Sequence, residues 1–89
     1  MKTTPRGTVD AFADGRRAIG GTLMTDGRAL WSYGMKIAQR TTEGIVVGDY
    51  TRTGGGFMSR TTSKHVALAK KKAHTIMLPE LFTELYAER

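Results

Sequence analysis

The sequence predicts an α+β fold: a small antiparallel β-meander of three to four strands, with one or two C-terminal helices packed on it. Three observations predict this class. They are an Asp-Gly pair between apolar stretches, a β-branched run after a second turn, and helical apolar spacing near the C-terminus. With 89 residues, the chain has room for one domain and one modest core.

The N-terminal segment is expected to be a flexible arm over residues 1–7, followed by a single domain over residues 8–89. Pro5 and Gly7 disfavour regular structure in the arm, and Lys2 and Arg6 make it positive. Residues 8–13 are the first candidate strand, and Asp14-Gly15 is a turn pair that would end it.

A hairpin is expected at Thr25-Asp26-Gly27-Arg28. Asp-Gly between apolar stretches is typical of a two-residue turn, because both residues tolerate positive φ. This turn would pair Leu23 with Leu30, between an incoming strand at about residues 17–25 and an outgoing one at about 28–33. Gly20-Gly21 inside the incoming strand suggests a bulge.

The outgoing strand is expected to continue with one buried face, because Trp31, Tyr33, Met35 and Ile37 share one parity. A second turn at residues 42–44 precedes a β-branched strand that reaches about Tyr50. The aromatic residues Trp31, Tyr33 and Tyr50 either pack in the core or, on an open face, stack unpaired bases.

Two helices are expected in the C-terminal third. The first follows Thr62 or Ser63 as N-cap and extends to about residue 74. The second begins at Pro79, a residue suited to the first helical position, and has an apolar face. Much of the core should come from Leu23, Leu30, Trp31, Tyr33, Ile37, Val46, Val66, Leu81, Phe82 and Leu85.

The charge of the chain is strongly uneven. The net charge is +6, with 13 basic and 5 acidic residues over residues 1–79, and 1 basic and 3 acidic residues over residues 80–89. A basic body suits an anionic partner, with nucleic acid as the first choice. The alternative is that the positive surface serves only to keep the chain in solution.

The richest candidate site is a Gly-rich segment followed by a helix start, over residues 54–65. Backbone amides at a helix N-terminus, with hydroxyls and cations around them, can hold a phosphate. The expected anion or nucleic-acid site comprises Arg60, Thr62, Ser63, Lys64, His65, Lys70, Lys71 and Lys72. Because the Walker and dinucleotide spacings are both absent, a capped helix after a loop remains the alternative.

Catalysis, cofactors and metals are not expected. Cysteine is absent, which excludes disulfides and thiolate metal sites. His65 and His74, nine residues apart, would lie at either end of one helix, where they cannot share a metal. No apolar run reaches the roughly 18 residues that a membrane span needs, and the N-terminus lacks a signal-peptide core, so a cytoplasmic protein is expected.

A resemblance covers about residues 23–68. The segment with Gly27, Leu30, Ser32-Tyr33-Gly34 and Ile37-Ala38, followed by Ser59 and Thr61-Thr62-Ser63-Lys64-His65, resembles short uncharacterised proteins of tailed bacteriophages. That family has no established activity to carry over. The resemblance implies an accessory protein that acts inside a bacterial host cell.

Two functions are therefore expected and are compatible with each other. The first is a non-enzymatic protein whose basic surface binds nucleic acid or another polyanion. The alternative is an interaction module that forms a homo-oligomer or targets a host protein through Met35, Met58, Leu68 and the last helix.

Overall fold

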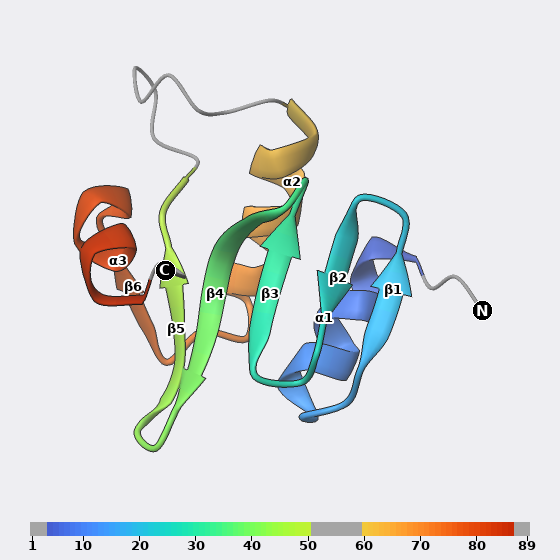
Figure 1. Cartoon of the computed structure of the whole chain (residues 1–89), viewed down its shortest axis with the longest axis horizontal. Helices are drawn as coiled ribbons and strands as arrows, with labels where there is room; N and C mark the ends of the chain where they lie inside the picture. The colour runs from blue at the N-terminus through green and yellow to red at the C-terminus, as the bar shows by residue number, and fades with distance from the viewer. Residues whose placement is uncertain (1–3, 51–59, 87–89) are drawn as a thin grey trace.

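The computed structural model describes residues 4–50 and 60–86, which form a six-stranded sheet and three helices (Figure 1). In chain order the elements are α1 (Pro5–Ala13), β1 (Ala18–Gly20), β2 (Leu23–Thr25), β3 (Ala29–Ser32), β4 (Met35–Thr41), β5 (Gly44–Gly48), α2 (Arg60–Lys70), β6 (Thr75–Met77) and α3 (Pro79–Tyr86). The α+β class is confirmed, with more strands and helices than the sequence indicated.

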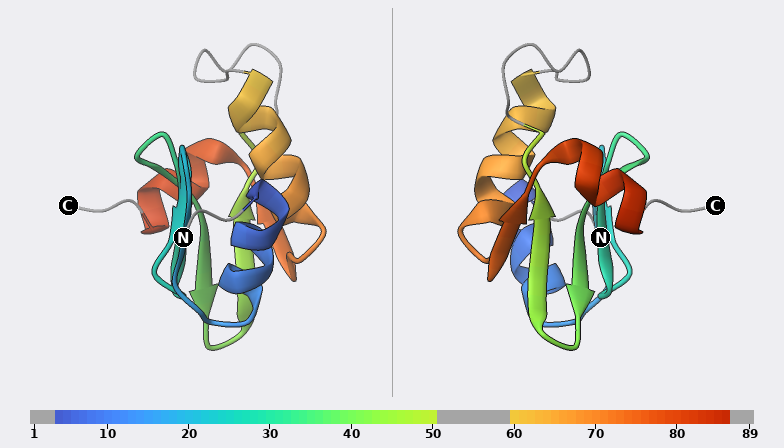
Figure 2. Two further views of the ribbon diagram at one scale, coloured as in Figure 1. Left: turned by 90° about the vertical axis from the view of Figure 1, so that its right-hand side faces the viewer. Right: turned by 90° about the vertical axis from the view of Figure 1, so that its left-hand side faces the viewer.

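The sheet is a meander with one added edge strand. Strands β1 to β5 follow one another in antiparallel order, and β6 joins β5 in parallel. Helices α1 and α2 lie on one face of the sheet, and α3 lies on the opposite face (Figure 2). The hydrophobic core therefore lies mainly between the sheet and the α1–α2 layer, with a smaller part beneath α3.

Helix α1 replaces the strand expected at residues 8–13, and it begins inside the expected arm. Thr4 caps the helix by accepting the Gly7 amide at 3.0 Å, and Pro5 occupies the first turn, where its missing N–H is no loss. Val9 and Phe12, three positions apart, are buried, so the helix has one apolar face on the sheet. Residues 1–3 of the expected arm lie outside the described residues.

The Asp-Gly turn exists, but the predicted register is wrong by two residues. Thr25 faces Leu30 and Leu23 faces Ser32, so the loop is longer than a two-residue turn. Asp26 Oδ1 accepts the amides of Arg28 at 2.8 Å and Ala29 at 3.0 Å. The backbone hydrogen bond from Ala29 is the main cause that lowers the pKa of the Asp26 carboxyl.

The strand expected to run through Tyr33 is in fact two strands. The chain reverses at Tyr33-Gly34, where both residues have positive φ (53° and 80°), as in a type I′ turn. The expected incoming strand is likewise divided into β1 and β2. The second turn is confirmed, since Thr41 pairs with Gly44 across residues 42–43.

Helix α2 begins at Arg60, so Thr62 and Ser63 lie within its first turn and are not its caps. It ends at Lys70, which leaves His74 in the following connection, where its Nδ1 accepts the Ile45 amide at 2.9 Å. That hydrogen bond lies next to β6, a strand that the sequence pattern does not indicate.

Most of the predicted core is confirmed. Leu23, Leu30, Ile37, Val46, Val66 and Phe82 are buried. Trp31 is half-buried, and Tyr33, Leu81 and Leu85 are exposed. Helix α3 differs from the prediction because it packs through Pro79, Phe82 and Tyr86, which leaves the leucine stripe facing away from the sheet.

Candidate anion-binding cleft

Helix α2 and the turn after it carry all eight residues predicted to bind an anion. Arg60, Thr62, Ser63, Lys64 and His65 lie in the first half of α2, Lys70 ends it, and Lys71 and Lys72 follow. The side chains of Arg60 and Thr62, and the Gly-rich segment 54–58, lie outside the described part of the structure. Among the remaining residues, the exposed cations are Lys64, Lys71 and Lys72.

His65 does not lie on the surface with these lysines. Its side chain is 3% exposed, and its Nδ1 lies 2.8 Å from the hydroxyl of Ser32, which is fully buried. Burial lowers the pKa of His65, which favours the neutral ring that can accept the Ser32 hydrogen. A serine next to a histidine is a familiar nucleophilic pair, but the burial of Ser32 keeps this one away from any substrate.

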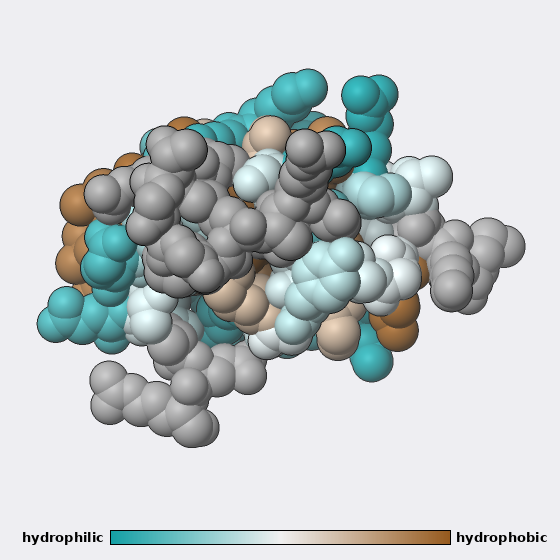
Figure 3. All heavy atoms as spheres, turned by 90° about the horizontal axis from the view of Figure 1, so that it is seen from above, coloured by the Kyte–Doolittle hydropathy of each residue, from teal (hydrophilic) through white to brown (hydrophobic). Residues whose placement is uncertain are grey.

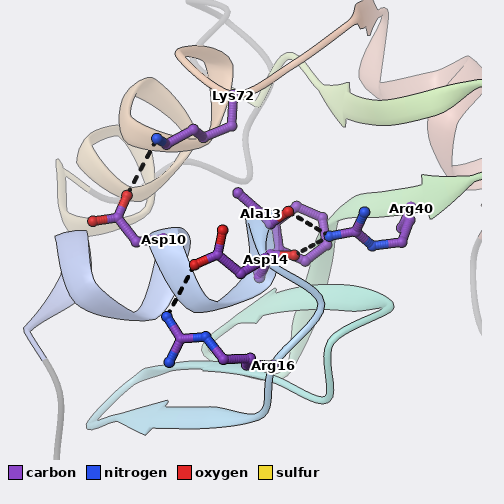
Figure 4. A network of polar contacts seen from close by, with 7 residues as sticks. Asp10, Ala13, Asp14, Arg16, Arg40 and Lys72 are labelled. Carbon is purple, nitrogen blue, oxygen red and sulfur yellow. Dashed lines mark hydrogen bonds and ion pairs between the residues drawn. The ribbon is translucent and has the colours of Figure 1, made fainter.

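Two of the predicted lysines take part in ion pairs. Lys70 Nζ lies 2.7 Å from Asp49, just after β5, and both side chains are largely buried. Lys72 Nζ lies 3.4 Å from Asp10 of α1, and both of these side chains are nearly half-exposed (Figure 4). Water screens the second pair, so Lys72 keeps much of its capacity to meet another anion.

A cleft of about 180 Å³ lies between α1 and the end of α2. It is lined by Arg6, Val9, Asp10, Leu68, Lys71 and Lys72. Three cations thus converge there with one carboxylate, above an apolar floor that includes the buried Val9. This is the site in the described residues where the predicted cations come together.

Arg6 is the one cation of this cleft that is absent from the predicted anion site. The sequence predicts a flexible arm at this position, whereas Arg6 lies in the first turn of α1. The signal that could have placed it is Thr4-Pro5, because a threonine cap followed by proline is typical of a helix start.

Arg40, one of the 13 basic residues over residues 1–79, makes its hydrogen bonds inside the fold. Its guanidinium donates to the carbonyls of Phe12 at 2.6 Å and Ala13 at 2.7 Å (Figure 4). It also donates to the carbonyl of Gly27 at 3.2 Å. It therefore satisfies the last carbonyls of α1 and ties the helix to β4 and the Asp-Gly turn. Arg16 is paired with Asp14 at 3.1 Å on the surface.

A second groove, of about 240 Å³, lies across β4, β5 and β6 beside the end of α3. Its lining includes Glu43 together with Thr41, Thr75 and Tyr86, and it contains no cation among its lining residues. An anion would meet only a carboxylate and hydroxyls there, so the α1–α2 cleft is the better anion site.

No family model, curated protein or solved structure matches the chain. Within residues 4–50 and 60–86, no helix is long and apolar enough to cross a membrane. In the same part of the chain, no three His, Asp or Glu side chains are grouped so that they could hold a metal ion.

Proposed function

We propose that the protein binds a polyanion, nucleic acid in the first place, through the cleft between α1 and α2. The observation that carries the proposal is the convergence of Arg6, Lys71 and Lys72 on that cleft, opposed by Asp10 alone. Each cation can neutralise one phosphate and release the counterions that surround it. The role is binding without turnover, and the resemblance to phage proteins suggests a bacterial cell as its setting.

The positive surface extends from the cleft along α2. Lys64, Leu68 and Lys71 are four and three positions apart, which places them on one stripe of the helix. The helical winding continues past Lys70, since the Lys71 amide donates to Leu68 and the Lys72 amide to Ala69. At 1.5 Å per residue, Lys64 and Lys71 are about 10 Å apart along the axis, so they can contact different phosphates of one strand.

The proposal predicts that Lys71→Gln weakens binding, whereas Lys70→Gln leaves it nearly unchanged. The two variants lose the same charge one residue apart, but Lys71 lines the cleft while Lys70 is paired with Asp49. We expect Lys71→Gln to lower affinity for a fluorescein-labelled oligothymidylate of about 12 nucleotides roughly fivefold at low salt, equivalent to ~1 kcal/mol. Fluorescence anisotropy measures both affinities, and circular dichroism checks that both variants are folded.

The comparison of the two variants shows whether affinity depends on the position of the lost lysine charge or only on net charge. If Lys70→Gln and Lys71→Gln weaken binding equally, net charge and not the cleft governs affinity. If the wild-type chain binds neither the oligothymidylate nor a longer polyanion at about 50 mM salt, the proposed function is wrong.

A second candidate function is self-association, favoured by the exposed apolar surface near the C-terminus. Ile76, Leu78, Leu81 and Leu85 are all about half exposed, and hydrophobic atoms gather at the end of the molecule that carries α3 (Figure 3). Apolar patches of this kind often mark protein contacts. Met35 and Leu68, expected at such a contact, are instead partly buried against the core, and Met58 lies outside the described residues.

Self-association predicts a discrete oligomer whose mass, measured by light scattering after size exclusion, exceeds that of one 9.8 kDa chain. A single-chain mass over a wide range of concentrations would remove this second candidate.

A further inference from the structure

Tyr33 has an unfavourable backbone conformation for its residue type. Its φ of 53° makes it the single non-glycine residue with positive φ in the described part of the chain. It occupies the first central position of the type I′ turn between β3 and β4, where Asn, Asp or Gly is strongly preferred. A bulky side chain with positive φ is a genuine outlier, so the fold alone does not account for a tyrosine here.

Core packing does not offset this strain. Tyr33 is 57% exposed, and within the described residues its ring contacts that of His65, at 6.5 Å between centroids and 29° between planes. His65 is itself fixed by its contact with Ser32. The tyrosine is thus contacted by a fixed partner, and more than half of the residue remains exposed. A strained residue that the core does not require is a reason to look for function.

The ring lies against the helix that also carries the exposed cations, because its contact partner His65 belongs to α2. His65, on which Tyr33 stacks, directly follows Lys64, the exposed cation at the N-terminal end of the stripe on α2. An exposed aromatic face next to a track of cations is the combination by which proteins hold single strands, with bases stacking on rings and phosphates meeting cations. Bases in a duplex are already stacked on one another, so only an unpaired base can use such a ring.

We propose that Tyr33 is a stacking platform for an unpaired base, and that the polyanion bound along α2 is therefore single-stranded nucleic acid. This inference rests on the proposed function, because it names the class of ligand for the same positive surface. In this proposal, phosphate binding and base stacking depend on different residues. Lys64, Lys71, Lys72 and Arg6 meet phosphates, and Tyr33 distinguishes a single strand from a duplex.

The test is Tyr33→Asn, with Tyr33→Phe as the matched control that keeps the ring. The probes are the oligothymidylate of about 12 nucleotides and a duplex of the same length, within the site sizes of single-strand binders. We expect wild type and Tyr33→Phe to prefer the single strand. Tyr33→Asn should lose about tenfold in affinity for the single strand, with little change for the duplex. Because Asn suits the turn, its melting temperature should rise by roughly 4 °C.

The outcomes separate this inference from the proposed function. Equal single-strand affinity of wild type and Tyr33→Asn would overturn the stacking role, while a loss in Lys71→Gln would still support the cationic cleft. A fall in the melting temperature of Tyr33→Asn would overturn the strain argument. Failure of the wild-type chain to bind either probe would remove the proposed function and this inference together.

Discussion

Phe82→Ala is expected to lower the free energy of unfolding by about 3 to 5 kcal/mol. The side chain has no exposed surface, and its ring packs edge-on to Tyr50 and obliquely to Tyr86, at centroid distances of 6.2 and 5.3 Å. It also lies directly against the backbone of β5, since a Cβ on Gly48 would be 2.9 Å from the ring. Alanine would leave a cavity between α3 and the sheet that the surrounding strands cannot close. Denaturation in urea measures the loss.

Leu81→Ala is the matched control, one residue earlier on the same helix. Leu81 is 44% exposed, so its truncation should change stability by less than about 1 kcal/mol. Equal losses from the two variants would mean that α3 does not face the sheet as the structure has it.

Gly27→Ala is expected to lower the free energy of unfolding by about 3 kcal/mol, from two sources. Gly27 has a φ of +96°, which an L side chain rarely adopts. An added Cβ would also lie 2.6 Å from the carbonyl oxygen of Gly15, a backbone atom that cannot move without shifting the connection between α1 and β1. Thermal unfolding followed by circular dichroism measures the change.

Gly21→Ala separates the two sources. Gly21 has a similar conformation, with φ of +72°, but an added Cβ would meet no atom within 4 Å. It should therefore show only the conformational cost, about 1 kcal/mol. A loss as large as that of Gly27→Ala would contradict the close approach of the Asp-Gly turn to Gly15.

The sequence predicted the elements whose signals are local. The Asp-Gly pair, the turn before Ile45 and Pro79 at the start of α3 are all where turn and cap chemistry put them. The class of fold followed from these signals, because alternating strands joined by short turns form an antiparallel meander.

The errors came from side-chain hydrogen bonds, turns and strand pairings that the pattern of residue types does not reveal. The register at the Asp-Gly turn depends on the Asp26 and Thr25 side chains, which hold a wider loop than the dipeptide alone indicates. Tyr33 has the same parity as the apolar residues around it, which predicts a continuous strand. The chain instead reverses at Tyr33, in spite of its unfavourable positive φ. Strand β6 is too short to carry a pattern of its own, since it spans Thr75–Met77.

The candidate site was predicted in part. Lys71 and Lys72 were included, but a list of cations does not reveal which are paired. Lys70 is held by Asp49, and Arg40 closes the end of α1. Arg6 joined the site only because α1 folds back beside α2, which no local signal in the sequence specifies.

The most direct measurement of the cationic surface, the cleft together with Lys64 on α2, is the salt dependence of oligothymidylate affinity between about 50 and 200 mM salt. If Arg6, Lys64, Lys71 and Lys72 each meet a phosphate of a single strand, the logarithm of the association constant should fall against the logarithm of salt with a slope of about −3. Lys71→Gln should reduce that slope by about 0.7, and Lys70→Gln should leave it unchanged. A slope near zero, or one that Lys71→Gln does not alter, would contradict the account.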